Sequence, residues 1–234
     1  MTHDPNILIV SFLGGLAPAL LWLWFWLKQD TKKEPRGLLF LAFILGMASV
    51  IFTIPLERLA AGYFSDSKTL IIIWASIEEL LKLGAVTLLV FHSLYLDEPV
   101  DYPIYFMTTA LGFAAFENSI FLIHPITVDG TTVSLLTGAL RFMGATLLHA
   151  VATGSIGIFL GLAFYHSTFV KVLYLLMGIA SAIALHSIFN FFIMDTSGNN
   201  FLRTFGYLWV VAIIIMLLFE KLRRMSSDRA IRAY

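Results

Sequence analysis

Long apolar runs recur along the chain and are separated by short polar connections. A helical membrane span needs about 20 mainly apolar residues. Seven segments meet this length, at 6–27, 37–61, 69–91, 102–123, 134–165, 170–194 and 202–219. The first run is too long for a signal-peptide core and no Lys or Arg precedes it, which indicates a retained anchor. The pattern predicts an all-α, polytopic membrane protein with about seven transmembrane helices.

Basic residues gather in alternate connections, which predicts the orientation in the bilayer. Ten of them fall on one side of a seven-span protein: Lys28, Lys32, Lys33, Arg36, Lys171, Lys221, Arg223, Arg224, Arg229 and Arg232. The other side receives only Arg58, Lys68 and Arg203. The side richer in Lys and Arg is normally cytoplasmic. We therefore expect the N-terminus outside and the C-terminus in the cytoplasm.

The composition agrees with a membrane location. Hydrophobic residues make up 59% of the 234 residues and charged residues 13%, with a mean hydropathy of +0.87, whereas soluble domains contain about 25% charged residues. The net charge is zero, so nothing favours nucleic acid as a partner. The absence of cysteine excludes thiol chemistry. We expect a single transmembrane domain over 1–234, with a functional core at about 69–194 and a basic cytoplasmic tail at 220–234.

Ionisable side chains nevertheless occur inside four of the predicted spans. A charge at mid-bilayer costs about 2.5–3.5 kcal/mol on insertion scales, so such residues are candidates for function. They are Glu78, Glu79 and Lys82 in the third span, Glu117 in the fourth, His149 and Arg141 in the fifth, and His186 with Asn190 in the sixth. Arg141 is close enough to a span end to reach the interface.

Helical spacing brings these residues together within each span. Lys82 follows Glu78 by four residues and Glu79 by three, so it can pair with either carboxylate. Two adjacent carboxylates resist ionising together in a low-dielectric site, an arrangement that suits a general base with an orienting partner. His186 and Asn190 share one helical stripe.

The depths of the four sites also match. At about 1.5 Å per residue, the Glu78–Glu79 pair lies roughly 14 Å below the outer end of its span, Glu117 roughly 10 Å, His149 roughly 20 Å and His186 roughly 13 Å. Within the uncertainty of the span ends, this is one layer at mid-membrane or in the outer half. A single polar cavity that opens outward explains the match.

Two versions of hydrolysis suit such a cavity. A carboxylate can activate water while His and Asn stabilise the oxyanion. Alternatively, Glu117, His149 and His186 can form a His2Glu zinc shell, with Glu78 or Glu79 as the base. A proton- or cation-coupled transporter that uses the same Glu/Lys/His set is the main rival. A haem protein with His149 and His186 as axial ligands and an inactive scaffold are weaker alternatives.

The order of motifs resembles one known family. EELLK (78–82), FAAFE (113–117), a lone mid-span His149 and HSIFN (186–190), on successive spans, look like the PrsW family of intramembrane proteases. The resemblance covers about 76–190. That family is related to the CAAX prenyl endopeptidases and the CPBP membrane proteases, whose motifs resemble EExxxR and FxxxH. Here Lys82 comes one residue earlier and Glu117 replaces the second-motif His, which disfavours a prenylated substrate.

The resemblance implies an endopeptidase of the bacterial or archaeal cell membrane. Its substrate would be a membrane-anchored protein, such as an anti-sigma factor that receives its first cut on the outer side. The residues carried over by motif are Glu78, Glu79, Lys82, Glu117, His149, His186 and Asn190. The family is classed with metallopeptidases, whereas its CAAX relatives are also described as glutamate-dependent and metal-free, so both versions of hydrolysis stay open.

Overall fold

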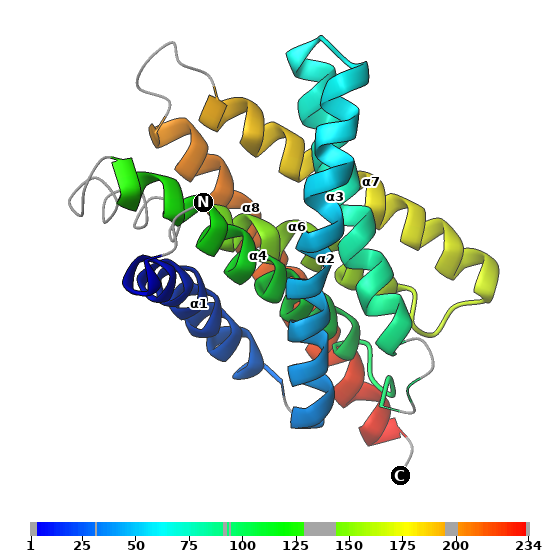
Figure 1. Cartoon of the computed structure of the whole chain (residues 1–234). Coiled ribbons are helices and arrows are strands. Elements are labelled where there is room, and N and C mark those ends of the chain that lie inside the picture. Colours follow the sequence, from blue (N-terminus) through cyan, green and yellow to red (C-terminus); the bar gives the residue numbers. More distant parts are fainter. Residues whose placement is uncertain are drawn as a thin grey trace.

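A computed structural model describes residues 4–30, 32–90, 93, 95–128, 144–194 and 201–232. This part of the chain forms seven α-helices and no strand (Figure 1). The helices are α1 (Pro5–Leu27), α2 (Arg36–Tyr63), α3 (Ser67–Val90), α4 (Asp101–Val128), α6 (Ala145–Leu162), α7 (Thr168–Met194) and α8 (Phe201–Arg232). The all-α polytopic class is confirmed.

Six of these helices are long and apolar enough to cross a bilayer. The exception is α3, because Glu78, Glu79 and Lys82 lie near its middle. The predicted spans match the helices, with two differences. The described part of the fifth span begins at Ala145, and 134–143 lie outside the described residues. The last helix continues past the predicted end at 219 to Arg232, where a Glu220–Arg224 pair one turn apart supports it.

The centre of the bundle is the pair α4 and α6. Residues 101–115 of α4 and 146–158 of α6 are all buried, since both helices are apolar or small on every face. Helices α1 and α2 pack on α4, whereas α7 and α8 pack on α6 and α3 packs on α2 and α7 (Figure 1). This arrangement turns α3, α4, α6 and α7 toward one common region.

Two glycines set the close approach of α2 to α4. A Cβ atom at Gly46 would overlap the backbone carbonyl of Thr109, and one at Gly112 would overlap the carbonyl of Phe43. Small residues at helix crossings are the usual means by which membrane helices pack closely. The crossing spans Thr109 to Phe113 on α4, about one turn before Glu117, so it fixes where the Phe113 and Glu117 side chains sit relative to α2.

The connections that sequence predicts to be cytoplasmic meet at one end of the bundle. Lys32 in the α1–α2 connection pairs with Asp97 in the α3–α4 connection. The ring of Trp26 at the end of α1 contacts Phe219 in α8. In Figure 1 the α1–α2 and α3–α4 connections and the end of α8 lie in the lower part of the picture, and the α6–α7 connection lies at the right. The helices therefore alternate in direction as seven crossings require, while the assignment of this end to the cytoplasm stays a prediction.

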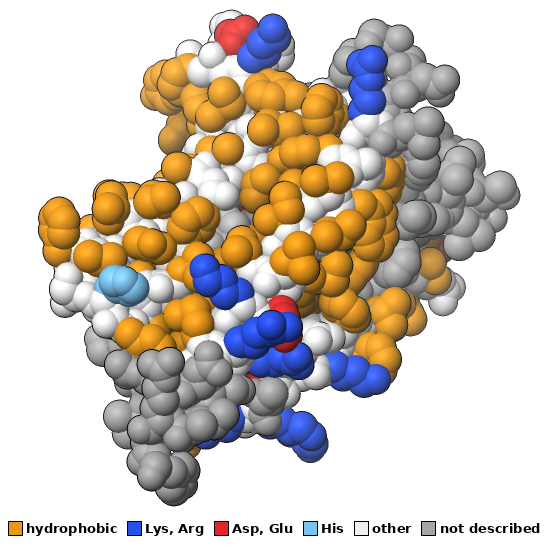
Figure 2. Space-filling model, turned by 180° about the vertical axis from the view of Figure 1, so that it is seen from behind, with side chains coloured by type: hydrophobic (Ala, Val, Ile, Leu, Met, Phe, Trp, Pro, Cys, Tyr) orange, Lys and Arg blue, Asp and Glu red, His pale blue; other side chains and the backbone are white. Residues whose placement is uncertain are grey.

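The outer surface is suited to lipid. Large apolar side chains that face outward include Phe40 at 68% exposure, Leu88 at 78% and Phe169 at 80%. Figure 2 shows hydrophobic side chains over most of the described face, with most Lys and Arg side chains in its lower half and others at its upper edge. An apolar band of this extent on a soluble protein would cause association. In a bilayer it is the normal surface.

We expect Gly112→Ala to destabilise the protein, because the added methyl group must displace the Phe43 carbonyl. Overpacking of this kind costs about 1–3 kcal/mol. The matched control is Gly84→Ala in α3, where no atom lies within 4 Å of an added Cβ and alanine favours the helix by about 1 kcal/mol. Thermal unfolding in detergent should show a lower melting temperature for the first variant only. Equal melting temperatures would contradict the proposed crossing.

Candidate functional site

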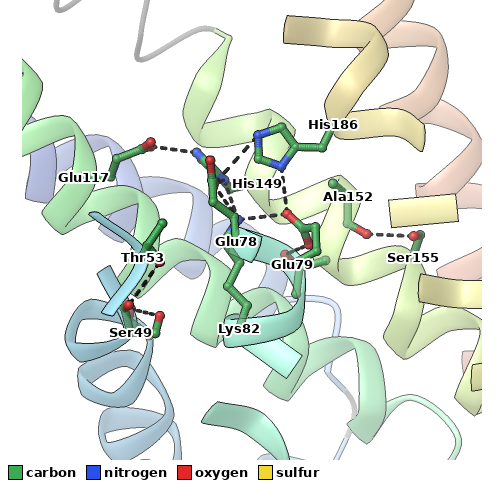
Figure 3. Close-up of polar contacts among 12 residues, drawn as sticks. Ser49, Thr53, Glu78, Glu79, Lys82, Glu117, His149, Ala152, Ser155 and His186 are labelled. Atoms are coloured by element: carbon green, nitrogen blue, oxygen red, sulfur yellow. Dashed lines mark hydrogen bonds and ion pairs between the residues drawn. The ribbon is translucent and has the colours of Figure 1, made fainter. Parts of the chain in front are cut away.

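The side chain of Lys82 is the hub of a buried polar cluster (Figure 3). It is fully buried, and its Nζ lies 2.8 Å from Oε1 of Glu79, 3.2 Å from Oε2 of Glu78 and 2.8 Å from Nδ1 of His149. An ammonium group has three N–H donors and no acceptor. All three donors are thus used, and Nδ1 of His149 must be the acceptor.

Glu79 is held on every side. It is fully buried, and Oε1 accepts from Lys82 and lies 2.9 Å from Nδ1 of His186. The hydroxyl of Thr153 donates to Oε2 at 2.7 Å. Because these are charge-assisted or short contacts on both oxygens, they stabilise an ionised Glu79. Its lone pairs are largely committed to the protein.

Glu78 is held more loosely than its neighbour. Its Oε2 accepts from Lys82 at 3.2 Å, and it lies 3.7 Å from Nδ1 of His149 and 3.8 Å from Nε2 of His186. Both imidazoles are therefore close to this oxygen but beyond direct hydrogen-bonding distance. A small reactant such as water fits the chemistry of this position better than it fits the position of Glu79.

Carboxylates fix the orientation of both histidines. Nε2 of His149 lies 2.9 Å from Oε2 of Glu117 and donates to it, since Nδ1 is already an acceptor. Nδ1 of His186 donates to Glu79, which leaves the lone pair of Nε2 on the side of Glu78. The two rings are edge to face with centroids 5.2 Å apart. That contact leaves no room for a haem between them.

The four groups of residues that sequence predicts to share one layer do meet. Glu78, Glu79 and Lys82 come from α3, Glu117 from α4, His149 from α6 and His186 from α7 (Figure 3). Asn190 is half-buried one turn beyond His186, and it makes no hydrogen bond to another described residue. Arg141 lies outside the described residues.

The carboxylate that completes a possible metal site with the two histidines is Glu78 and not the expected Glu117. One donor atom each of Glu78, His149 and His186 lie within 4.8 Å of one another, whereas Glu117 was the expected partner. Both imidazoles have a carboxylate on the other nitrogen, a common arrangement around metal-binding histidines. The donor set thus fits a divalent ion such as zinc. Because Lys82 occupies the Nδ1 side of His149, a metal bound there requires the ammonium to withdraw.

A cavity of about 300 Å³, here called the lateral cavity, lies beside Glu117 among residues of α2, α3 and α4. Glu117, Phe113 and Phe121 of α4 line it, with Trp74 of α3 and α2 residues that include Glu57. The Glu57 carboxyl interacts electrostatically with Glu78 and Glu117. The sequence analysis did not include Glu57 among the candidate residues. Glu57 lies within the second predicted span, and an ionisable residue inside a span is a candidate for function.

Taken together, the fold and the cluster define a membrane-embedded protein with a buried carboxylate–imidazole–ammonium centre. Such a centre contains the groups needed to activate water and to move protons. Each charged side chain in it also has a hydrogen-bond or ion-pair partner within the cluster.

Comparison with known proteins assigns the family. The family model described as "PrsW family intramembrane metalloprotease" matches residues 34–219, so the chain belongs to the PrsW family of intramembrane proteases. It is 26% identical over 205 residues to Protease PrsW of Oceanobacillus iheyensis, an alignment that covers 86% of this chain and 91% of the relative. It is 24% identical over 225 residues to Protease PrsW of Bacillus subtilis, with 93% and 95% covered.

A third relative, Protease PrsW of Clostridioides difficile, is 24% identical over 214 residues and covers 88% of this chain and 84% of the relative. No solved structure matches. The protein is therefore a membrane-embedded peptidase and a multi-pass bacterial membrane protein. Family membership decides for a protease over the transporter and haem alternatives.

Proposed function

We propose that this protease hydrolyses a peptide bond of a membrane-anchored protein with water activated by Glu78. The observation that carries the proposal is the unequal state of the two adjacent carboxylates. Glu79 is committed to Lys82, His186 and Thr153, whereas Glu78 lies beside the free lone pair of His186. Glu79 orients the centre, and Glu78 remains able to react.

The proposed reaction transfers one proton when water adds to the peptide carbonyl and one when the C–N bond breaks. Glu78 takes a proton from water, and the hydroxide oxygen adds to the carbonyl carbon of the scissile bond. As Glu78 becomes neutral, its hold on Lys82 weakens, so the ammonium and the Asn190 amide stabilise the oxyanion. The C–N bond then breaks, and the proton on Glu78 passes to the leaving amine, directly or through Nε2 of His186. The products are a carboxylic acid and an amine, and transfer of the acid proton to the amine gives the carboxylate and the ammonium.

Glu78, His149 and His186 would hold a zinc ion in the metal-dependent version of this chemistry. Bound zinc would supply a water whose pKa is lowered to about 7. Glu117 orients His149 and also lines the lateral cavity, so it is the carboxylate left to accept a proton when Glu78 serves as a ligand. Glu78 is required in both versions.

The lateral cavity is the proposed route for the substrate. Its apolar lining, which includes Trp74, Phe113 and Phe121, suits a segment that arrives from the bilayer. The predicted orientation places the centre at mid-membrane or toward the outer side. This supports a single-span substrate, such as an anti-sigma factor, that receives its first cut on the outer side.

We expect Glu78→Gln to reduce cleavage of a co-expressed, doubly tagged single-span anti-sigma factor by at least a hundredfold, because loss of a general base typically costs 10²–10⁴-fold. Immunoblotting of both tags measures the cut. Glu220→Gln, in a surface pair on α8, is the matched control and should cleave normally. The melting temperature of Glu78→Gln checks its fold. A folded Glu78→Gln protein with full activity would remove the proposed role of this carboxylate.

In the metal-dependent version, the zinc content of the purified protein should depend on Glu78, His149 and His186. We expect about one zinc per chain in protein purified without chelators, and little in Glu78→Ala or His186→Ala. Glu117→Ala should weaken zinc affinity about 10–100-fold, because it removes the carboxylate that orients a ligand. Elemental analysis by mass spectrometry measures these contents, with Glu220→Ala as the control. Active protein without zinc would contradict the metal-dependent version and leave the Glu78–water version.

A further inference from the structure

A second large cavity lies away from the polar centre, between the end of α1 and the start of α2. Its volume is about 740 Å³. Both helices pack on α4 rather than on each other, so a gap is left where the chain turns between them. Nothing in the proposed hydrolysis uses this cavity.

One wall of the cavity is apolar and follows the last two turns of α1. Leu20, Leu23, Trp24 and Leu27 line it, and Leu39 of α2 faces them. Trp24 and Leu20 are about half exposed. At about 1.5 Å per residue, the stretch from Lys28 back to Leu20 spans roughly 12 Å. That length is comparable to the roughly 15 Å depth of one leaflet of a 30 Å hydrocarbon core.

Three cations line the polar end of the same cavity. Lys28, Lys33 and Arg36 are exposed, and none forms an ion pair with a described residue. The Lys28 ammonium lies 3.8 Å from the centre of the Trp24 ring, which places it above the apolar wall. Lys32, in contrast, is already paired with Asp97 across the loops.

The two acids that line the same cavity also accept hydrogen bonds from the protein. Glu34 is 7% exposed and accepts from the hydroxyl of Tyr105, whereas Asp30 accepts from the backbone N–H of Glu34 at 3.1 Å. Burial raises the pKa of both carboxyl groups. Three cations and two acids line the cavity, so its polar end keeps a net positive charge even with both acids ionised.

We propose that this cavity binds an anionic glycerophospholipid, with its phosphate group at Lys28, Lys33 and Arg36 and an acyl chain along Leu20–Leu27. The charge at one end and the apolar wall at the other match the two parts of such a lipid. Basic pockets between membrane helices are known to bind anionic head groups. A zwitterionic lipid would use the apolar wall but gain less from the cations.

Binding of phosphatidylglycerol and phosphatidylcholine with brominated acyl chains to the full chain in a nonionic detergent tests the proposal. Bromine quenches tryptophan fluorescence on contact, so Trp24 reports the occupied cavity. We expect saturable quenching, with phosphatidylglycerol at least tenfold tighter. The Trp24→Phe variant should lose most of the quenching, since Trp24 is the cavity's tryptophan.

The charge variants separate a built site from general attraction to a basic surface. Lys28→Gln/Lys33→Gln/Arg36→Gln should weaken phosphatidylglycerol binding at least tenfold and abolish the preference. Lys28→Arg/Lys33→Arg/Arg36→Lys should bind normally, which shows that the charge matters. The matched control is Lys171→Gln/Lys221→Gln/Arg224→Gln, at the same predicted membrane side but outside the cavity, and it should stay within twofold.

Three results would overturn the proposal. They are equal affinity for the two lipids, an equal loss in the control triple variant, and displacement of the lipid by millimolar inorganic phosphate, which would indicate a simple anion site. Melting temperatures of all variants show whether the fold is intact. The outcome is independent of cleavage activity, because none of these residues contacts the polar centre.

Discussion

The structure depends on one buried ammonium group. Lys82 binds Glu78, Glu79 and His149 from a position without exposure to solvent. Two adjacent carboxylates and two imidazoles could not share a membrane interior without such a cation, because the loss of hydration costs several kcal/mol per ion. The two carboxylates differ in their other partners, since Glu79 accepts from His186 and Thr153 whereas Glu78 interacts with the Glu57 carboxyl.

Sequence predicted the helices well, and it also singled out the intramembrane ionisable residues that the structure brings together, for a physical reason. Apolar length reports a membrane span directly, and a charge such as Glu117 or His149 is too costly inside a span to be incidental. The partners could not be predicted, because they depend on helix rotation. The sequence analysis grouped Glu117 with both histidines. In the structure Glu117 contacts Nε2 of His149, and Glu78 lies beside Nδ1 of the same ring. Glu57 was missed because it lies near the end of a span.

The bundle keeps the buried polar cluster apart from the basic loop between α1 and α2, with α4 and α6 at its centre. Helices α4 and α6 are buried on every side and carry the Glu117 and His149 ends of the cluster. Helix α3 is too polar to resemble an ordinary span, and it is tolerated because its charged side chains have polar partners within the bundle. The basic loop between α1 and α2 lies away from this cluster and lines a separate cavity with three cations and two acids. Catalysis and lipid contact are thus proposed for different parts of the chain.

A double-mutant cycle between Lys82 and Glu79 tests most directly whether the ammonium holds the centre together. Lys82→Met leaves buried carboxylates without their cation and should cost about 3–5 kcal/mol in unfolding free energy in detergent. If the pair is the organising contact, Glu79→Gln in the Lys82→Met background should restore stability, with a coupling energy of about 2 kcal/mol or more. A coupling energy near zero, with the two losses simply additive, would contradict the account.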